Sequence, residues 1–466
     1  QTLGMSEMKC TPPDISLLVV PHAFNSVNPT ASAGSGTVAL LTGEVQLSAS
    51  DASQSLPEGA LSISRQYLSY DGPQNSSQAV FGQGWRASFS GIDSGAATLS
   101  VADTTATQRL ITLSDSNGET LVYKVPSGLS GNSPTGTYLP ADPSTAEAQA
   151  TLSVVGATSK TLQLVEADGR KTIWNEATSN GKTLWLLHTI TEATGQLTNS
   201  YTYDSNLRVT RILGPAPSGV SCYNNSENAG CKALFISYAT ATNTITGDFA
   251  GQVKSIDFKA YDPATSSMQR KTVATYKYDV AGYLASATDP RSNITTNYSY
   301  TVNALTQVKL LTAISQSTGL AGTYFIYDSQ ARLLHVSLDK ADGSTGKDVV
   351  STFVYNYQNG QNILPANTVN LWDQTVYPKN VAAVFGSNAP AEISEATENL
   401  TSITSSSLKF GTYYFSNSDG VTVNTATFGK SAWRYTYTKF DEQYRPLAVF
   451  DENAIDQIIN LNSQGL

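Results

Sequence analysis

Apolar and polar residues alternate along much of the chain beyond residue 42, a pattern that predicts β-strands with one buried face. In residues 60–70, one face of the predicted strand carries Leu61, Ile63, Arg65 and Tyr67, with serine and glutamine between them. Further strands of this kind are predicted in residues 43–50, 98–103, 108–125 and 161–174. The Asn-Gly pair at 117–118 and the Asp-Gly pair at 168–169 predict tight hairpin turns within two of them, because both pairs readily adopt positive φ.

A short unit recurs along the second half of the chain. It consists of an aromatic residue, any residue, a tyrosine and an aspartate, followed by turn residues, an arginine or tyrosine, and an apolar stretch. Its clearest copies are Tyr201, Tyr203 and Asp204; Tyr276, Tyr278 and Asp279; and Phe325, Tyr327 and Asp328. Weaker copies are Tyr298 with Tyr300, Tyr355 with Tyr357, and Tyr435 with Tyr437.

Each copy of the unit is interpreted as a β-hairpin. Its two aromatic residues lie on one face of a strand, its aspartate opens the turn, and its basic or aromatic residue begins the return strand. A single hairpin cannot bury its apolar face, so successive hairpins are expected to join in one continuous antiparallel sheet.

The composition narrows the class of protein. Only 14% of the 466 residues are charged, against roughly 25% in a typical globular domain, and the formal net charge is −9. This acidic balance gives no electrostatic basis for binding nucleic acid or an anionic membrane. No stretch of 18 apolar residues is present to span a bilayer. Together with Gln1 as a mature end after signal-peptide removal, these features predict a secreted or cell-surface protein.

The three cysteines point to an oxidising compartment. Cys222 and Cys231 bracket a polar, asparagine-rich segment and are expected to form a local disulfide, although two free thiols are the alternative. Cys10 is left over and is either free or paired between chains. The three histidines, His22, His188 and His335, are not spaced as zinc ligands with these cysteines.

At these units the sequence resembles the YD-repeat (Rhs-type) family, which includes bacterial polymorphic-toxin carriers, wall-associated proteins and, more distantly, the toxin-complex cocoon and the teneurin shell. The resemblance extends to residues 81–86, whose sequence FGQGWR is similar to a phrase in the block that precedes the repeats in this family. Its structural residues here are Arg65, Tyr67, Phe81, Gly82, Gly84 and Trp85.

The resemblance implies an all-β fold, in which a long antiparallel sheet of stacked hairpins forms an open spiral or partial shell beside an N-terminal β-rich block. Three regions are expected: an irregular segment 1–36, a β-rich block 37–180 with a loop at 126–148, and a degenerate repeat region 181–466. Shells of this family often enclose a C-terminal toxin. This chain has few clear repeats and lacks the Asp-Pro-rich motif that often ends such shells, so it is either a fragment or a short member that cannot close a shell alone.

Two roles are open for the aromatic residues. Tyr67, Tyr70, Phe81 and Trp85 either form a ligand platform or plug a core, and the core is favoured. The repeat tyrosines either stack on glycans or pack across strands, and packing is favoured. The repeat aspartates either bind calcium or, as is usual for aspartate at the first position of a turn, cap their own backbone.

No catalytic, cofactor or metal residues are assigned, because no hydrolase motif or nucleotide-binding loop occurs. The function expected is that of a secreted, non-enzymatic scaffold or surface-interaction protein. Its partner would be another copy, in an oligomer or extracellular filament formed through sheet edges, or a cell-surface glycan. The alternatives are the N-terminal part of a toxin-delivery shell with an encapsulated cargo, and a polysaccharide-binding or polysaccharide-cleaving protein.

Overall fold

The computed structural model defines most of the chain beyond residue 22. The residues that it describes are 23–24, 27–56, 59–71, 80–89, 98–100, 110–114, 120–126, 134–179, 182–194, 197–222, 227–364, 366–372, 374, 376–441 and 444–464. Cys10 and His22 lie outside the described residues.

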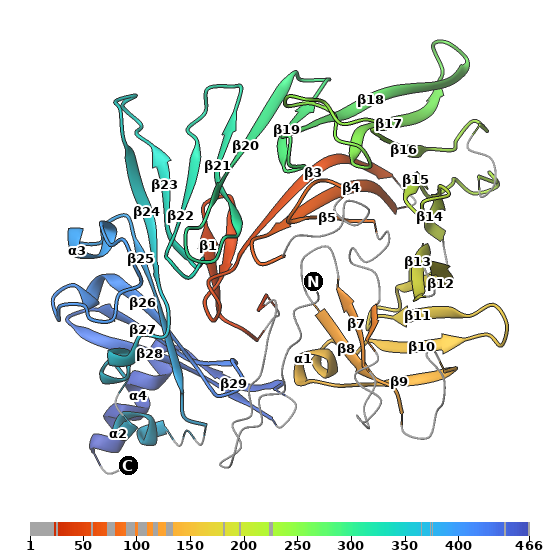
Figure 1. The fold of residues 1–466 in the computed structure, drawn as a ribbon. Coiled ribbons are helices and arrows are strands. Elements are labelled where there is room, and N and C mark those ends of the chain that lie inside the picture. Colours follow the sequence, from red (N-terminus) through yellow and green to blue (C-terminus); the bar gives the residue numbers. More distant parts are fainter. Residues whose placement is uncertain are drawn as a thin grey trace.

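The described strands form two antiparallel sheets (Figure 1). The first sheet contains five strands in chain order: β1 (Thr30–Ala33), β2 (Gly36–Ala39), β3 (Val45–Leu56), β4 (Gly59–Leu68) and β5 (Trp85–Ala87). We call it the N-terminal sheet. Its longest pair, β3 with β4, contains a β-bulge between Ser50 and Ala52.

The second sheet, which we call the long sheet, is a continuous meander in which every strand from β6 to β29 pairs antiparallel with the next. Its first half contains β6 (Thr98–Ser100), β7 (Leu110–Ser114), β8 (Thr120–Lys124), β9 (Gly136–Pro140), β10 (Thr151–Val155), β11 (Thr161–Val165), β12 (Lys171–Ser179), β13 (Lys182–Thr191), β14 (Leu197–Tyr203), β15 (Val209–Leu213), β16 (Ala233–Tyr238) and β17 (Val253–Asp262).

The second half of the long sheet contains β18 (Ser267–Tyr278), β19 (Leu284–Asp289), β20 (Ile294–Val302), β21 (Lys309–Gln316), β22 (Thr323–Tyr327), β23 (Leu333–Asp339), β24 (Lys347–Val354), β25 (Asn380–Gly386), β26 (Gly411–Ser416), β27 (Thr422–Gly429), β28 (Ala432–Phe440) and β29 (Pro446–Phe450). Short helices connect or cover some strands: α1 (Pro143–Glu147), α2 (Ala366–Val369), α3 (Ala391–Ser394), α4 (Glu452–Ser463) and the 3-10 helices η1 (Gln358–Asn362), η2 (Asn370–Trp372) and η3 (Leu408–Phe410).

The prediction of an all-β fold with a long antiparallel sheet is confirmed, but the predicted regions differ in detail. β1 lies in the segment expected to be irregular. The range 126–148, expected to be a loop, contains β9 and α1. Tyr138 in β9 is buried, and the Asp142 side chain caps α1 by accepting a hydrogen bond from the Thr145 backbone N–H, so two local interactions order this stretch despite its glycine and proline content.

The block expected at 37–180 belongs to both sheets. Its first part forms β2 to β5 of the N-terminal sheet, whereas β6 to β12 begin the long sheet. Residue 180 falls between β12 and β13, which pair directly with each other. The structural division therefore lies between β5 and β6 and not at residue 180.

The long sheet curves around the N-terminal sheet. In Figure 1, β3, β4 and β5 run along the inner side of the arc that β14 to β24 form. One hydrophobic cluster contains residues from both sheets, including Leu47, Phe81 and Trp85 of the N-terminal region and Leu311 and Phe353 of the long sheet. This cluster therefore lies between the two sheets.

The predicted disulfide between Cys222 and Cys231 is present. Both residues are buried and pack with Leu213 at the end of β15 and Ala233 at the start of β16. The bond closes the connection between these two paired strands.

Replacing both Cys222 and Cys231 by alanine is expected to lower the free energy of unfolding by about 2–3 kcal/mol, because the bond restricts a short loop in the unfolded chain. Urea unfolding of the double variant measures this loss. Wild-type protein under reducing conditions should lose a similar amount, and Ser221→Ala, next to the bond, serves as the matched control. Equal stability of wild type and double variant would contradict the expectation.

Candidate functional site

Residues from β3, β4 and β5 form a buried polar junction between the two sheets. Arg65 on β4 is 2% exposed, and its Nε donates to both carboxylate oxygens of Asp51, at 2.9 and 3.1 Å. Asp51 is the extra residue of the β3 bulge, a local distortion that can redirect a side chain. Burial alone would lower the pKa of Arg65, but the Asp51 carboxylate, with smaller contributions from Tyr298 and Tyr276, offsets this and holds that pKa above its usual value. The guanidinium therefore stays charged.

Aromatic rings from both sheets complete the surroundings of this cation. Arg65 Nη2 donates to the Tyr298 hydroxyl at 2.9 Å, and the guanidinium carbon lies 4.6 Å from the Trp85 ring centroid. Trp85 is 1% exposed, and its indole N–H donates to the Tyr300 hydroxyl at 2.9 Å. Two hydroxyl groups of strand β20 thus hold the Arg65 guanidinium and the Trp85 indole in place. Because it is buried, Trp85 offers no free ring face to a ligand.

Gly82 and Gly84 allow the chain to approach its neighbours closely. Both have positive φ, +96° and +79°. A Cβ atom at Gly82 would lie 2.8 Å from the Leu284 backbone nitrogen, and one at Gly84 would lie 2.8 Å from a ring carbon of Tyr67. Trp85 therefore belongs to a core, the role favoured for it from the sequence. The phrase is a packing feature, and the aromatic platform is not formed.

The N-terminal region also accepts hydrogen bonds from strands of the long sheet. The backbone N–H groups of Val253, Leu333 and Thr422 open β17, β23 and β27, and they donate to the carbonyls of Val80, Gly43 and Val27 at 2.8, 3.0 and 3.0 Å. In β21, the Leu311 N–H donates to the Tyr67 hydroxyl at 2.9 Å. These bonds satisfy strand donors that face the N-terminal sheet.

The repeat tyrosines and Phe325 also face the core. Tyr276, Tyr278, Phe325, Tyr435 and Tyr437 are buried, and Tyr201, Tyr203 and Tyr327 are half-buried and pack against the same cluster as Phe325. In three units the second tyrosine donates its hydroxyl to a carbonyl on the preceding strand: Tyr203 to Leu187 at 2.6 Å, Tyr278 to Val253 at 2.7 Å and Tyr327 to Leu311 at 3.0 Å.

Those hydroxyls remain donors over the whole physiological pH range. Burial raises the pKa of Tyr203, Tyr278 and Tyr327 well above the usual value of tyrosine. Each ring thus anchors one strand to its neighbour by a polar bond as well as by packing. This is the cross-strand role that the sequence favoured over glycan stacking.

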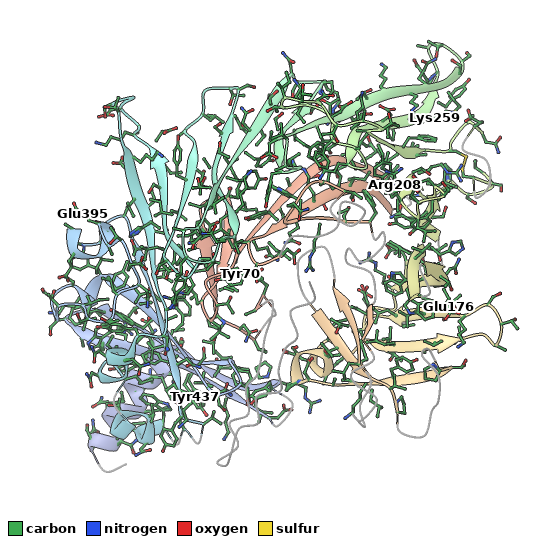
Figure 2. All side chains as sticks on the ribbon, viewed as in Figure 1. Tyr70, Glu176, Arg208, Lys259, Glu395 and Tyr437 are labelled. Carbon is green, nitrogen blue, oxygen red and sulfur yellow. A yellow bond between two sulfur atoms is a disulfide. The ribbon has the colours of Figure 1, made fainter. Side chains whose placement is uncertain are left out.

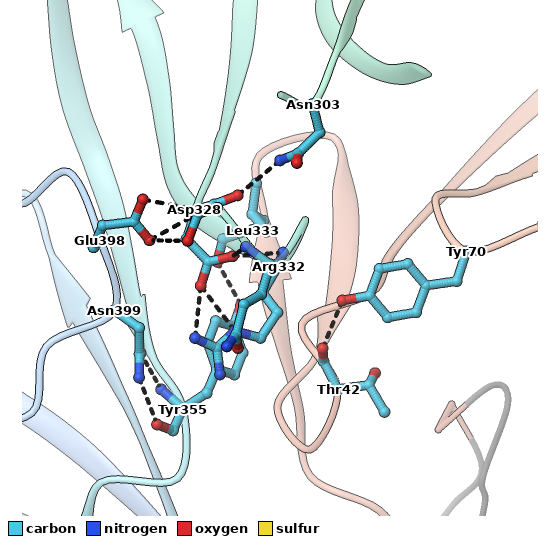
Figure 3. Close-up of polar contacts among 11 residues, drawn as sticks. Thr42, Tyr70, Asn303, Asp328, Arg332, Leu333, Tyr355, Glu398 and Asn399 are labelled. Carbon is cyan, nitrogen blue, oxygen red and sulfur yellow. Dashed lines mark hydrogen bonds and ion pairs between the residues drawn. The ribbon is translucent and has the colours of Figure 1, made fainter. Parts of the chain in front are cut away.

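The repeat aspartates cap their own turns. In the unit at Asp328, one carboxylate oxygen accepts from the backbone N–H groups of Gln330 and Arg332 at 3.0 and 2.9 Å, and the other accepts from Arg332 Nε at 2.8 Å (Figure 3). Asp204 and Arg208 repeat these contacts (Figure 2 labels Arg208). Ala331 and Leu207 occupy the positive-φ position just before the arginine.

In the third unit, Asp279 accepts from the backbone N–H groups of Ala281 and Tyr283, both at 2.9 Å, and binds Lys309 from the next hairpin. All three repeat aspartates therefore have protein partners for both carboxylate oxygens. Within the described part of the chain, no group of three or more His, Cys, Asp or Glu residues is arranged to hold a metal ion.

The weaker copy at Tyr435 and Tyr437 differs from the clear copies in the position of its turn. Tyr435 and Tyr437 do lie on β28, but the turn that follows is opened by Asp441, which accepts from the Arg445 backbone N–H at 2.9 Å and from its Nε at 2.6 Å. The pair Phe440-Asp441 carried the signal for this turn. A further copy at Asn417 uses an asparagine and lacks the arginine, so the motif could not reveal it.

Candidate binding surfaces include two cavities and one strand edge. A cavity of about 390 Å³ lies between β3 and strands β18 to β21, and one of about 770 Å³ lies beside β20, β21 and β22. The last strand, β29, pairs with β28 and with no other described strand. These surfaces are where a partner can reach the protein.

Glu398 and Asn399, in the segment between α3 and η3, bind the turn after β22 and the residue that follows β24. Glu398 accepts hydrogen bonds from the backbone N–H and the hydroxyl of Ser329, and the backbone bond is the main reason that its pKa lies below the usual value (Figure 3). Asn399 donates to the Tyr355 carbonyl and accepts from its N–H, at 2.9 and 2.8 Å. Glu398 is held ionised and is poorly suited to act as a general acid.

No helix among the described residues is long and apolar enough to cross a membrane. Compared with protein-family models and with curated proteins, the chain matches none. The resemblance to YD-repeat proteins therefore rests on the residues themselves.

Trp85→Ala is expected to lower the free energy of unfolding by about 3–5 kcal/mol, because it removes a fully buried ring and leaves a cavity beside a buried cation. Chemical denaturation measures the change. Tyr261→Ala, which removes a 39% exposed ring on β17, is the matched control and should cost much less. Similar small losses in both variants would contradict the structural role of Trp85.

His335 is expected to make stability depend on pH. Its Nδ1 lies 2.8 Å from Thr352 Oγ1 and its Nε2 lies 2.6 Å from the Ala396 carbonyl oxygen. Burial lowers the pKa of His335, and the bond to Ala396 offsets this only in part. The unfolded chain therefore binds a proton that the folded chain rejects, once the pH falls below about 6.5.

The free energy of unfolding should accordingly fall as the pH drops below about 6.5, by at most about 1.4 kcal/mol per pH unit from this residue. Above that pH the contribution is constant. Urea unfolding of wild type and His335→Gln at several pH values measures it, with the wild-type curve falling more steeply toward low pH. Parallel curves would show that His335 does not titrate in this way.

Proposed function

We propose that the protein is a secreted, non-enzymatic scaffold of the YD-repeat type that associates with other copies of itself through an edge of the long sheet. The observation that carries this proposal is that the aromatic and acidic residues of the motifs form their hydrogen bonds with other residues of the fold. Tyr278, Asp328 and Trp85 all have internal partners. The motifs thus build a rigid curved sheet, which is the property a scaffold needs.

The edge strand β29 is the surface that supports self-association. It is the last strand of the long sheet, and Leu447 and Val449 on it are 63% and 70% exposed. An exposed strand edge that carries apolar side chains is a template for pairing with another strand. Pro446 lacks a backbone N–H, which limits the pairing to the residues that follow it.

An extracellular location is compatible with two further features. The disulfide between Cys222 and Cys231 forms readily only in oxidising compartments. The low proportion of charged residues, 14%, and the many serine and threonine residues agree with this location. We therefore include secretion in the proposed function.

If β29 mediates association, Leu447→Lys combined with Val449→Lys should abolish it, because charges on an edge strand oppose pairing. Sedimentation velocity over a range of concentrations is the measurement. Wild type should form dimers or larger species as the concentration rises, and the double variant should stay monomeric.

Leu320→Lys provides the matched control, since Leu320 is 68% exposed but lies in the turn between β21 and β22. This variant should associate like wild type. A wild-type protein that stays monomeric at high concentration would reject self-association and favour the alternative role, as part of a toxin-enclosing shell.

A further inference from the structure

The cavity of about 770 Å³ lies on the face of the long sheet that is turned away from the N-terminal sheet. Leu311 on β21 and Phe325 on β22 pack in the cluster between the two sheets. Their chain neighbours Leu310 and Ile326 point to the opposite face of the strands, where they line the cavity. We call this site the outer cavity. Its volume is in the range of small-molecule sites in proteins.

The outer cavity combines a buried apolar floor with an exposed apolar rim. Leu310 is buried, whereas Ile326, Val302 and Leu305 are 43%, 50% and 68% exposed. The opening arises where β21 and β22 diverge after pairing at only two positions. Apolar side chains gathered around one opening gain free energy when an apolar ligand covers them.

Charged residues lie at the two ends of the outer cavity. At the start of β22, the Nζ atom of Lys347 lies 3.3 Å from the centroid of the Tyr324 ring. Beyond the end of β22, the lining contains Asp328 and Glu398, and Glu398 binds the Ser329 hydroxyl (Figure 3). An extended strand from Tyr324 to Asp328 separates the two ends by about 13 Å. The cavity is therefore cationic at one end, acidic at the other and apolar between them.

Only the cationic end has a charge that no ion pair offsets. The two carboxylates of the acidic end already bind Arg332 and Ser329. Within the described part of the chain, Lys347 takes part in no salt bridge. Asp339, its neighbour across β23 and β24, instead accepts a hydrogen bond from the Tyr324 hydroxyl. An anionic group would thus bind beside Lys347, and the acidic end would repel it.

We infer that the outer cavity binds a free, linear acyl carboxylate of medium chain length. Its carboxylate lies beside Lys347, and its chain runs over Ile326 and Leu310 toward Leu305. The acidic end fixes this orientation and limits the length of the chain. The inference does not depend on self-association through β29, because the outer cavity lies on different strands.

Saturation-transfer NMR and calorimetric titration test the inference on the whole protein, at concentrations below micelle formation. The probes are octanoate, decanoate and decylammonium. Decanoate should bind about fourfold more tightly than octanoate, because each added methylene that is buried over about half its area contributes roughly a factor of two. Decylammonium has the same chain with the opposite charge and should bind at least fivefold more weakly than decanoate.

Two variants locate the site. Lys347→Glu should weaken decanoate binding at least fivefold and strengthen decylammonium binding, because it reverses the charge at one end of the cavity. Lys271→Glu is its matched control, since Lys271 is exposed on β18 and does not line the cavity.

Ile326→Glu should weaken decanoate binding at least tenfold, because it places a carboxylate among the apolar side chains that cover the ligand. Leu320→Glu is its matched control, since Leu320 is 68% exposed and lies outside the lining. Thermal unfolding checks that all four variants are folded.

Three results would overturn the inference. The first is that neither carboxylate binds, which would leave the cavity to water alone. The second is that decylammonium binds wild type as tightly as decanoate does. The third is that Lys347→Glu or Ile326→Glu binds decanoate as its control does, which would place the site elsewhere.

Discussion

The fold depends on the contact between the N-terminal sheet and the inner face of the long sheet. A meander of hairpins has one face that must be covered, and here strands from residues 30–87 cover it. The contact is apolar over most of its area, but its centre is the ion pair between Arg65 and Asp51, surrounded by Trp85 and Tyr298. A buried ion pair is costly to break, since either partner alone would be an uncompensated charge.

The repeat motif supplies the second level of order. Each aspartate sets one turn, and each second tyrosine ties its strand to the preceding one. Where β21 and β22 pair over only two residues, Tyr67 and Tyr327 bind the free N–H and carbonyl of Leu311. Hydroxyl groups thus replace backbone pairing at the point where the two strands diverge.

The sequence predicted those parts of the fold that depend on local chemistry. The alternation at Leu61, Ile63 and Tyr67 predicted a strand, and the spacing of Cys222 and Cys231 around a polar segment predicted the disulfide. These outcomes depend on neighbours in the chain.

The rest depends on contacts between distant residues, which one sequence does not reveal. Arg65 and Tyr298 are 233 positions apart, and the sequence around either residue does not identify the other as its partner. The division between the two sheets was missed for the same reason, since β5 and β6 have similar strand character but different partners. The cavity of about 390 Å³ is equally hidden, because its two walls come from separate sheets.

The bond from the Asn28 side chain to the Gly420 carbonyl has a consequence for biosynthesis. It joins residues 392 positions apart, close to the two ends of the described chain. At roughly 5–20 residues per second, the ribosome needs on the order of 20–80 s to make the intervening chain. During that time the N-terminal sheet has emerged without most of the strands that will cover it. A chaperone that shields it in this interval would protect the chain from aggregation.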